Sequence, residues 1–201
     1  MKPASRIHWA RLRLTTSPPA GCRYATQLGQ AGRPARAGVA LLAAVPPTGN
    51  GGIVARITKA SLLEALKITW AFVGKPFARS AAAARDTFFS PDIGAGDLAR
   101  YQAQLAACSP VRLLDLGALR AELPLPPLPA AAAGLPAFVG SGDADRVVDV
   151  PAVEEAAAYF GVPAVVWPRT AHDCMLDTRW EAAAASLRAW LDALPPPAAP
   201  Q

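Results

Sequence analysis

Three short, continuous apolar runs constrain the fold of this chain more than any other feature of its sequence. They lie at residues 38–45 (GVALLAAV), 135–140 (LPAFVG) and 162–167 (VPAVVW), and residues that favour turns or loops follow each of them. Runs that are apolar on both faces and end in turn residues are typical of strands buried in a parallel sheet. The sequence therefore predicts about three parallel strands.

Apolar residues recur at helical spacing between and after these runs. Helices are expected at 58–73, 77–88, 97–107, 111–120, 151–160 and 176–194. The prolines of residues 123–129 (LPLPPLP) exclude a helix interior and predict an extended linker. Strands that alternate with helices across short loops indicate an α/β fold, with a parallel sheet and flanking helices.

Charge divides the chain into a basic head and an acidic body. Residues 1–63 contain nine Lys or Arg and no Asp or Glu, whereas the other residues carry eleven basic and fifteen acidic groups, a net charge of −4. Nucleic-acid binding needs a basic face on the folded domain, so the acidic body argues against a nucleic-acid partner. We expect the folded domain at 38–194, and a disordered proline-rich tail at 195–201.

Two interpretations of residues 1–37 stay open. The segment is rich in Arg, Ser, Thr, Pro and Gly, which fits either a poorly ordered or non-native head or an organellar transit peptide. The three cysteines are far apart and odd in number, so they predict neither a disulfide framework nor a metal pair and favour a reducing compartment. No apolar run reaches the roughly 20 residues of a membrane span. The expected location is intracellular: cytoplasmic, or organellar if residues 1–37 act as a transit peptide.

Acidic residues and a histidine follow two neighbouring strands of the predicted sheet. Asp143 and Asp145 come after the second apolar run, and His172 comes after the third. Because ligands bind beyond the carboxyl ends of parallel strands, these side chains should project from one edge of the sheet. An aspartate that accepts from one imidazole nitrogen leaves the other as a general base. In the alternative interpretation, the aspartates cap the next helix and His172 is an ordinary loop histidine.

Four segments of the sequence resemble one known family. A Val-Pro-Pro-Thr-Gly-Asn-Gly loop at 45–51 precedes a helical region, Gly-x-x-Asp-x-x-Val stands at 142–148, and Ala-His-Asp-x-Met-Leu stands at 171–176, with a helix that includes Trp180 after it. Together they resemble the C-terminal half of an α/β-hydrolase of the lysophospholipase or esterase-like type. The resemblance covers roughly residues 38–194.

The resemblance implies a partial α/β-hydrolase fold with a helical lid at about 58–120. It implies that His172 is the base of a catalytic triad and that Asp145 is its acid, with Asp143 as the alternative acid. The lid would shape an apolar pocket for a small acyl or ester substrate, and no metal or organic cofactor is implied. The candidate pocket residues are Leu66, Trp70, Phe72 and Phe88, for which ordinary core packing is the other interpretation.

The sequence departs from this family at the nucleophile. The family places its serine in a Gly-x-Ser-x-Gly elbow, but neither Ser5 nor Ser17 has the flanking glycines, and Ser141 runs directly into the acidic turn. Cys174 is expected to be a packing residue. The resemblance therefore implies a truncated, inactive chain whose full-length form hydrolyses carboxylic esters or related acyl compounds. The alternative is a non-catalytic remnant that binds a small molecule or a partner, and the exposed edge of a half sheet would favour self-association.

Overall fold

A parallel sheet stands at the centre of the computed structural model, which describes residues 14–15, 38–107, 123–128 and 134–194. Its strands are β1 (Leu14–Thr15), β2 (Val39–Leu42), β3 (Ala137–Gly142) and β4 (Ala164–Trp167). All neighbours pair in parallel in the order β1-β2-β3-β4. The prediction of an α/β fold with about three parallel strands is confirmed, since three of these strands are the predicted apolar runs and β1 is a two-residue addition.

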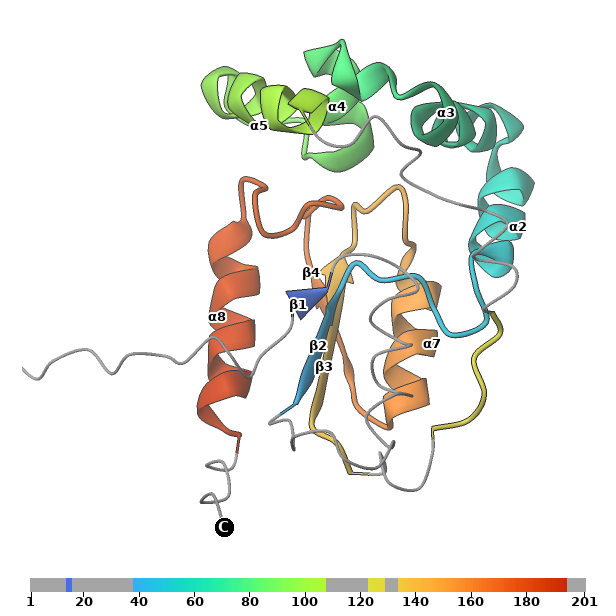
Figure 1. Cartoon of the computed structure of the whole chain (residues 1–201), viewed down its shortest axis with the longest axis vertical. Coiled ribbons are helices and arrows are strands. Elements are labelled where there is room, and N and C mark those ends of the chain that lie inside the picture. Colours follow the sequence, from blue (N-terminus) through green and yellow to red (C-terminus); the bar gives the residue numbers. More distant parts are fainter. Residues whose placement is uncertain (1–13, 16–37, 108–122, 129–133, 195–201) are drawn as a thin grey trace, which may run out of the picture.

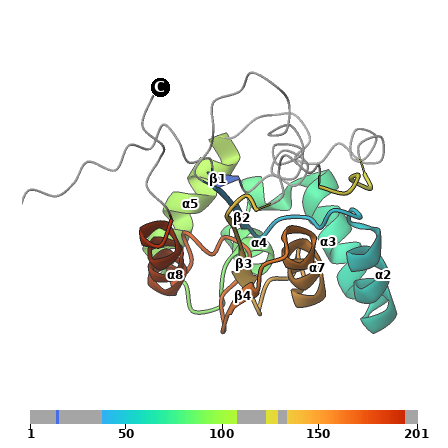
Figure 2. The same ribbon diagram turned by 90° about the horizontal axis from the view of Figure 1, so that it is seen from below.

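Two helices cover opposite faces of the sheet (Figures 1 and 2). On one face, α7 (Val150–Phe160) packs Val153 and Ala156 against Leu41 and Val139. On the other face, Ala183 and the partly buried Leu187 and Trp190 of α8 (Trp180–Asp192) pack with Phe138 and Trp167. Successive strand residues point to opposite faces, so one apolar run supplies both cores.

A layer of helices lies over the carboxyl ends of the strands, at the top of Figure 1. We call residues 51–107 the helical cap. It contains α2 (Gly51–Ala60), α3 (Leu62–Gly74), the 3₁₀ turn η2 (Pro76–Ala78), α4 (Ala81–Phe88) and α5 (Ala95–Ala107). Its own core consists of the buried residues Phe77, Ala84, Phe88, Phe89 and Leu98. The cap thus packs partly on itself and partly on the loops that leave the sheet.

The helix predicted at 58–73 is wrong in its extent. The residues from Gly51 were expected to form a loop but begin α2, and a break at Ser61 separates α2 from α3. Ser61 is extended and its hydroxyl accepts a hydrogen bond from the backbone N–H of Glu64, which is the geometry of a helix N-cap. Ser80 caps α4 in the same way, so the helix predicted at 77–88 is a 3₁₀ turn followed by a shorter helix.

Two further predictions are corrected near the C-terminus of the domain. The strand predicted at 162–167 was expected to be buried on both faces, but Val166 is 37% exposed because β4 has a single neighbouring strand in the described sheet. The helix predicted at 176–194 begins only at Trp180, since residues before it form turns around the buried Asp177. The expectations for 1–37, 111–120 and 195–201 fall outside the described residues, apart from β1.

Candidate active site

The carboxylate of Asp145 lies buried in the loop after β3, with all of its hydrogen-bonding capacity in use. Its Oδ1 accepts from the backbone N–H groups of Val147 (2.7 Å) and Val148 (2.9 Å). Its Oδ2 accepts from the hydroxyl of Ser141 (2.9 Å) and lies 2.9 Å from Nδ1 of His172. Four contacts hold this carboxylate in one orientation, which is what a group that aligns an imidazole requires.

His172 lies in the loop after β4 and turns one ring nitrogen toward Asp145. The ionised carboxylate is an acceptor, so neutral His172 carries its proton on Nδ1 and leaves the lone pair on Nε2. No group in the described part of the chain forms a hydrogen bond with that Nε2 atom, and 17% of the side chain is exposed. The imidazole also packs 5.9 Å from the ring of Phe88 in the cap. The arrangement can accept a proton at Nε2.

Two loops meet because the strands that precede them end in register. We call the loop after β3 that carries Asp145 the acid loop and the loop after β4 that carries His172 the base loop, after the roles that the sequence predicts for these residues. Gly142 pairs with Trp167 at the ends of β3 and β4. The backbone N–H of Ala144 then donates to the carbonyl of Thr170 at 3.1 Å. A Cβ atom on Gly142 would lie 1.8 Å from that same carbonyl oxygen. Glycine at this position is therefore what allows the two loops to approach closely enough for Asp145 to reach His172.

Asp143, the alternative acid, serves a different contact. Its Oδ1 accepts from the backbone N–H of Arg169 at 2.6 Å, and its own backbone N–H donates to the carbonyl of Trp167. It thus ties together the two loops that hold the acid and the base. Of the two candidate aspartates, the structure brings Asp145 to His172.

Opposing effects act on the proton affinity of His172. Burial lowers the pKa of His172, but the negative charge of Asp145, the hydrogen bond to it and the charge of Asp173 outweigh burial and raise the pKa above its ordinary value. Burial raises the pKa of Asp173; His172 opposes that rise, and the charges of Asp145 and Asp177 add to it. The site therefore stabilises the imidazolium, the form that His172 takes after it accepts a proton.

Solved structures similar to this one share a single fold. The chain matches the non-haem bromoperoxidase BpoC from Mycobacterium tuberculosis H37Rv (TM-score 0.56, 16% identity, 92% of this chain and 68% of that one). It also matches the esterase RhEst1 from Rhodococcus sp. ECU1013 (TM-score 0.54, 18% identity, 92% and 66%). A third match is the 2-hydroxy-6-oxo-6-phenylhexa-2,4-dienoate hydrolase BphD from Rhodococcus sp. strain RHA1 (TM-score 0.51, 20% identity, 78% and 55%).

The chain has a partial α/β-hydrolase fold. It spans between 55% and 68% of the length of these three proteins. A scan against protein-family models finds no match, and a search among curated proteins finds none either. At such low identity the likeness establishes the fold, and the chemistry has to be argued from the site.

Among the described residues of this hydrolase fold, no hydroxyl or thiol forms a hydrogen bond with His172. Ser141 is buried and donates to Asp145, so its hydroxyl helps to fix the orientation of that carboxylate. Cys174 is fully buried, and burial followed by the charge of Asp145 raises the pKa of its thiol to about 12. Such a thiol stays protonated at neutral pH and is a poor nucleophile. Ser5 and Ser17 lie outside the described residues.

A buried carboxylate that the sequence analysis did not single out joins the cap to the base loop. Asp177 is 1% exposed; its Oδ1 accepts from the backbone N–H of Ser90, and its Oδ2 accepts from the Ser90 hydroxyl and the backbone N–H of Ala171. A second link runs from the backbone N–H of Asp173 to the carbonyl of Phe88. Asp177 therefore fixes the backbone next to His172 against the segment that follows α4.

The structure separates the four predicted pocket residues into two pairs. Phe88 is buried in the cap core, where its ring centroid lies 6.4 Å from that of Phe72 and 5.9 Å from that of the His172 imidazole. Leu66 and Trp70 are more than half exposed, because α3 turns the opposite face, with the buried Ala71, toward the molecule. Phe88 thus borders His172 and Phe72 packs behind it, whereas Leu66 and Trp70 face solvent.

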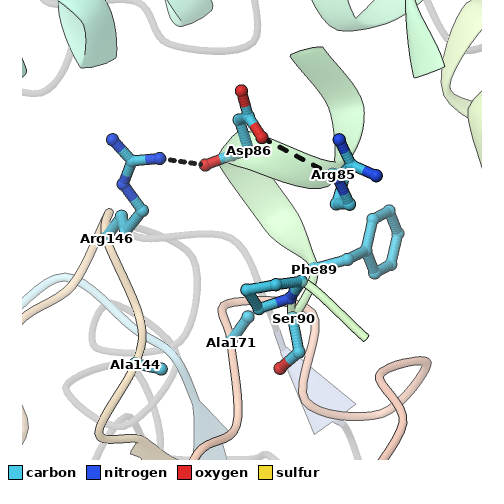
Figure 3. A pocket seen from close by; sticks show the side chains of 8 residues that line it. Arg85, Asp86, Phe89, Ser90, Ala144, Arg146 and Ala171 are labelled. Carbon is cyan, nitrogen blue, oxygen red and sulfur yellow. Dashed lines mark hydrogen bonds and ion pairs between the residues drawn. The ribbon is translucent and has the colours of Figure 1, made fainter. Parts of the chain in front are cut away.

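A cavity of about 270 Å³ opens between the cap and the two site loops (Figure 3). Arg85, Asp86, Phe89, Ser90 and Pro91 line it from the cap side, and Ala144, Arg146 and Ala171 line it from the loops. Arg146 crosses from the acid loop to donate to the carbonyl of Asp86. Ala144 and Ala171 directly precede Asp145 and His172 in the sequence, so the cavity lies beside the acid–base pair without containing it.

The described residues contain no group of three or more His, Cys, Asp or Glu side chains placed to hold a metal ion. None of the described helices is long and apolar enough to cross a membrane.

Proposed function

We propose that this chain carries the acid and base of a serine hydrolase that cleaves carboxylic esters or related acyl compounds. The observation that supports it best is the 2.9 Å contact between Nδ1 of His172 and Oδ2 of Asp145. The pair lies where β3 and β4 end, at the edge where α/β sheets bind ligands. The named esterase and hydrolase among the similar structures add a fold that hosts this chemistry.

The proposed roles follow from the proton positions. Nε2 of His172 would take the proton of a serine hydroxyl as its oxygen attacks the carbonyl carbon, and would then pass that proton to the leaving alcohol. A water molecule would be activated in the same way to release the acid from the acyl-enzyme. Asp145 would hold the proton on Nδ1 and stabilise the imidazolium. These steps use side chains alone.

The serine itself is the part of the proposal that this sequence does not supply. None of its 201 residues stands in a Gly-x-Ser-x-Gly elbow. We therefore propose that hydrolysis belongs to a longer form of the protein, in which a strand–elbow–helix segment brings a serine to Nε2 of His172. The chain as given is then inactive toward esters, because loss of the nucleophile removes most of the rate even when acid and base remain.

The apolar wall at the site suggests the class of substrate. Phe88 is buried and packs on Phe72, and its ring lies beside the imidazole of His172. We propose that this pair of phenylalanines contacts the acyl or alkyl part of the substrate. Leu66 and Trp70 are not part of this wall, because their side chains are exposed on the cap.

The test compares the chain with an extended form. The 201-residue chain should turn over p-nitrophenyl butyrate no faster than its His172→Ala variant. A form extended by the upstream in-frame coding sequence, if that contains Gly-x-Ser-x-Gly, should be active. In that form, His172→Ala and Asp145→Asn should lower kcat by about 10³-fold or more. Asp143→Asn is the matched control, and it should keep kcat within about fivefold because Asp143 does not contact the imidazole.

Two results would contradict the proposal. If no upstream elbow exists, the proposal of a serine hydrolase is wrong. If the extended form is active and indifferent to His172→Ala, the acid–base assignment is wrong. Esterase activity of the 201-residue chain that disappears in His172→Ala would retain the acid–base pair and overturn the inactivity of this form.

A further inference from the structure

The outer face of the cap concentrates the exposed apolar side chains of the molecule. Of the eight large apolar side chains that are exposed in the described part of the chain, six lie on α2 and α3, at the right-hand end of the cap in Figure 1. Each of the six is more than half exposed: Val54, Leu62, Leu63, Leu66, Trp70 and Val73. A soluble surface rarely gathers so many without a binding role.

Five of these residues form one face of α3. At about 100° per residue, Leu62, Leu66 and Val73 fall along one line of the helix, with Leu63 and Trp70 beside it. The buried Ala71 is on the opposite side and packs toward the molecule. The helix is therefore amphipathic, but its apolar side faces solvent, whereas the apolar side of an ordinary surface helix faces the core.

Basic residues surround this apolar face. Residues 51–75 contain four basic residues, of which Arg56 is paired with Asp149, and a single acidic one, Glu64. Glu64 is paired with Lys67 on its own helix and with Arg146 of the acid loop. Lys59 stands at the end of α2, just before α3, and Lys75 is the residue that ends α3. Lysines thus lie before this apolar face, after it and at its border. Helices that lie on anionic lipid surfaces have this pattern of charge.

We propose that the face formed by Val54, Leu62, Leu63, Leu66, Trp70 and Val73 docks the protein on an anionic lipid membrane. The leucine and valine side chains enter the acyl boundary, the Trp70 indole lies at the headgroup level, and the lysines contact lipid phosphates. A second copy of this chain is a poorer occupant, because its face would present the same excess of positive charge. Docking here is independent of the acid–base pair, which lies at the sheet edge.

Vesicle sedimentation of the whole chain tests this docking. Vesicles of equal parts phosphatidylcholine and phosphatidylglycerol should bind it, and vesicles of phosphatidylcholine alone should bind it at least about fivefold more weakly. The double variant L66Q/W70Q should lower binding to the anionic vesicles about tenfold. The matched control is Trp180→Gln, which removes a 48%-exposed tryptophan from α8 and should leave binding unchanged. Residues 1–37 are the same in all three proteins, so their basic side chains cannot produce a difference between the variants.

Four outcomes would overturn the proposal. The first is the absence of sedimentation with anionic vesicles, and the second is equal binding of wild type and L66Q/W70Q. The third is a concentration-dependent dimer in size-exclusion chromatography with light scattering that L66Q/W70Q abolishes, since a second copy would then cover the face. The fourth is a fall in thermal midpoint of more than about 5 °C in L66Q/W70Q, which would show that another segment of this chain covers it.

Discussion

The sheet edge around Asp145 and the outer face of α3 treat their side chains in opposite ways. At the sheet edge, polar groups are buried and paired: the Asp145 carboxylate takes four contacts, and the Asp177 carboxylate accepts four hydrogen bonds while 1% exposed. On α3, bulky apolar groups such as Leu66 and Trp70 are exposed although water is a poor environment for them. The sheet edge holds its side chains in one arrangement, whereas α3 presents apolar side chains to solvent.

This contrast separates residues that shape a site from residues that meet another surface. Buried polar networks hold one geometry because each unmade hydrogen bond costs free energy. Exposed apolar side chains contribute little to the folded state, and a cluster of them on one face is typical of a binding surface. Substitutions at the sheet edge should therefore change stability, and substitutions on α3 should change association.

The largest effect is expected at Gly142. A Cβ there would overlap the backbone carbonyl of Thr170, which belongs to the base loop, so Gly142→Ala should destabilise the fold by about 3 kcal/mol or more. Gly96→Ala is the matched control, since nothing lies within 4 Å of its added Cβ in α5, and it should stay within about 1 kcal/mol of wild type. Urea unfolding measures both. Equal stability of the two variants would show that the loops can part without cost.

The next effect is expected at Asp177. Asp177→Ala leaves the backbone N–H groups of Ser90 and Ala171 buried without acceptors, so it should cost about 2 to 3 kcal/mol of unfolding free energy. Asp97→Ala removes an exposed carboxylate that pairs with Arg100, and it should cost less than about 0.5 kcal/mol. Chemical denaturation distinguishes them. If Asp177→Ala lowers the unfolding free energy no more than Asp97→Ala does, the hydrogen bonds of Asp177 between the cap and the base loop do not stabilise the fold.

A smaller effect should depend on pH. The pKa of His172 is raised in the folded chain, so its protonated form contributes stability that is fully present below the unfolded pKa and is lost as pH rises through the folded pKa. The difference in unfolding free energy between wild type and His172→Gln should thus be larger at pH 5.5 than at pH 8.5. The same difference at both pH values, or the reverse order, would contradict the raised pKa.

The smallest effect on stability is expected on α3. Leu66→Ala removes a side chain that is more than half exposed, so it should change the unfolding free energy by less than about 0.5 kcal/mol. Leu41→Ala in β2 is the comparison, because that leucine is fully buried and should cost about 2 to 5 kcal/mol. Thermal or urea unfolding measures the pair. A large loss at Leu66 would mean that α3 is covered by other residues of the chain.

Much of the fold and the pairing of Asp145 with His172 could be predicted from the sequence. Continuous apolar runs identify buried parallel strands, and parallel strands end at one edge, which brings the residues that follow them together. The motif resemblance then favoured Asp145 over Asp143, and the hydrogen bond lies where that choice expects it. Both predictions rest on patterns among residues close in the sequence.

Other features depend on contacts that a pattern does not encode. The periodicity through Leu66 and Trp70 identifies an apolar helix face but cannot say whether that face turns toward the core or away from it. The helical pattern predicts that Asp177 lies in a helix. No feature of the sequence near Asp177 indicates that its carboxylate accepts a hydrogen bond from Ser90, 87 positions earlier. Ser61, by contrast, carries a readable N-cap signal three residues before Glu64, and the longer apolar stripe obscured it.

The central claim is that Asp145 sets the protonation of His172, and NMR of the imidazole nitrogens tests it most directly. The chain has two histidines, so a His8→Ala background leaves one signal set to follow with pH. We expect a His172 pKa above its ordinary value of 6.5, with the neutral ring protonated on Nδ1, and a fall in that pKa in Asp145→Asn, where the charge of Asp145 no longer opposes burial. An unchanged pKa in Asp145→Asn, or a neutral ring protonated on Nε2, would contradict it.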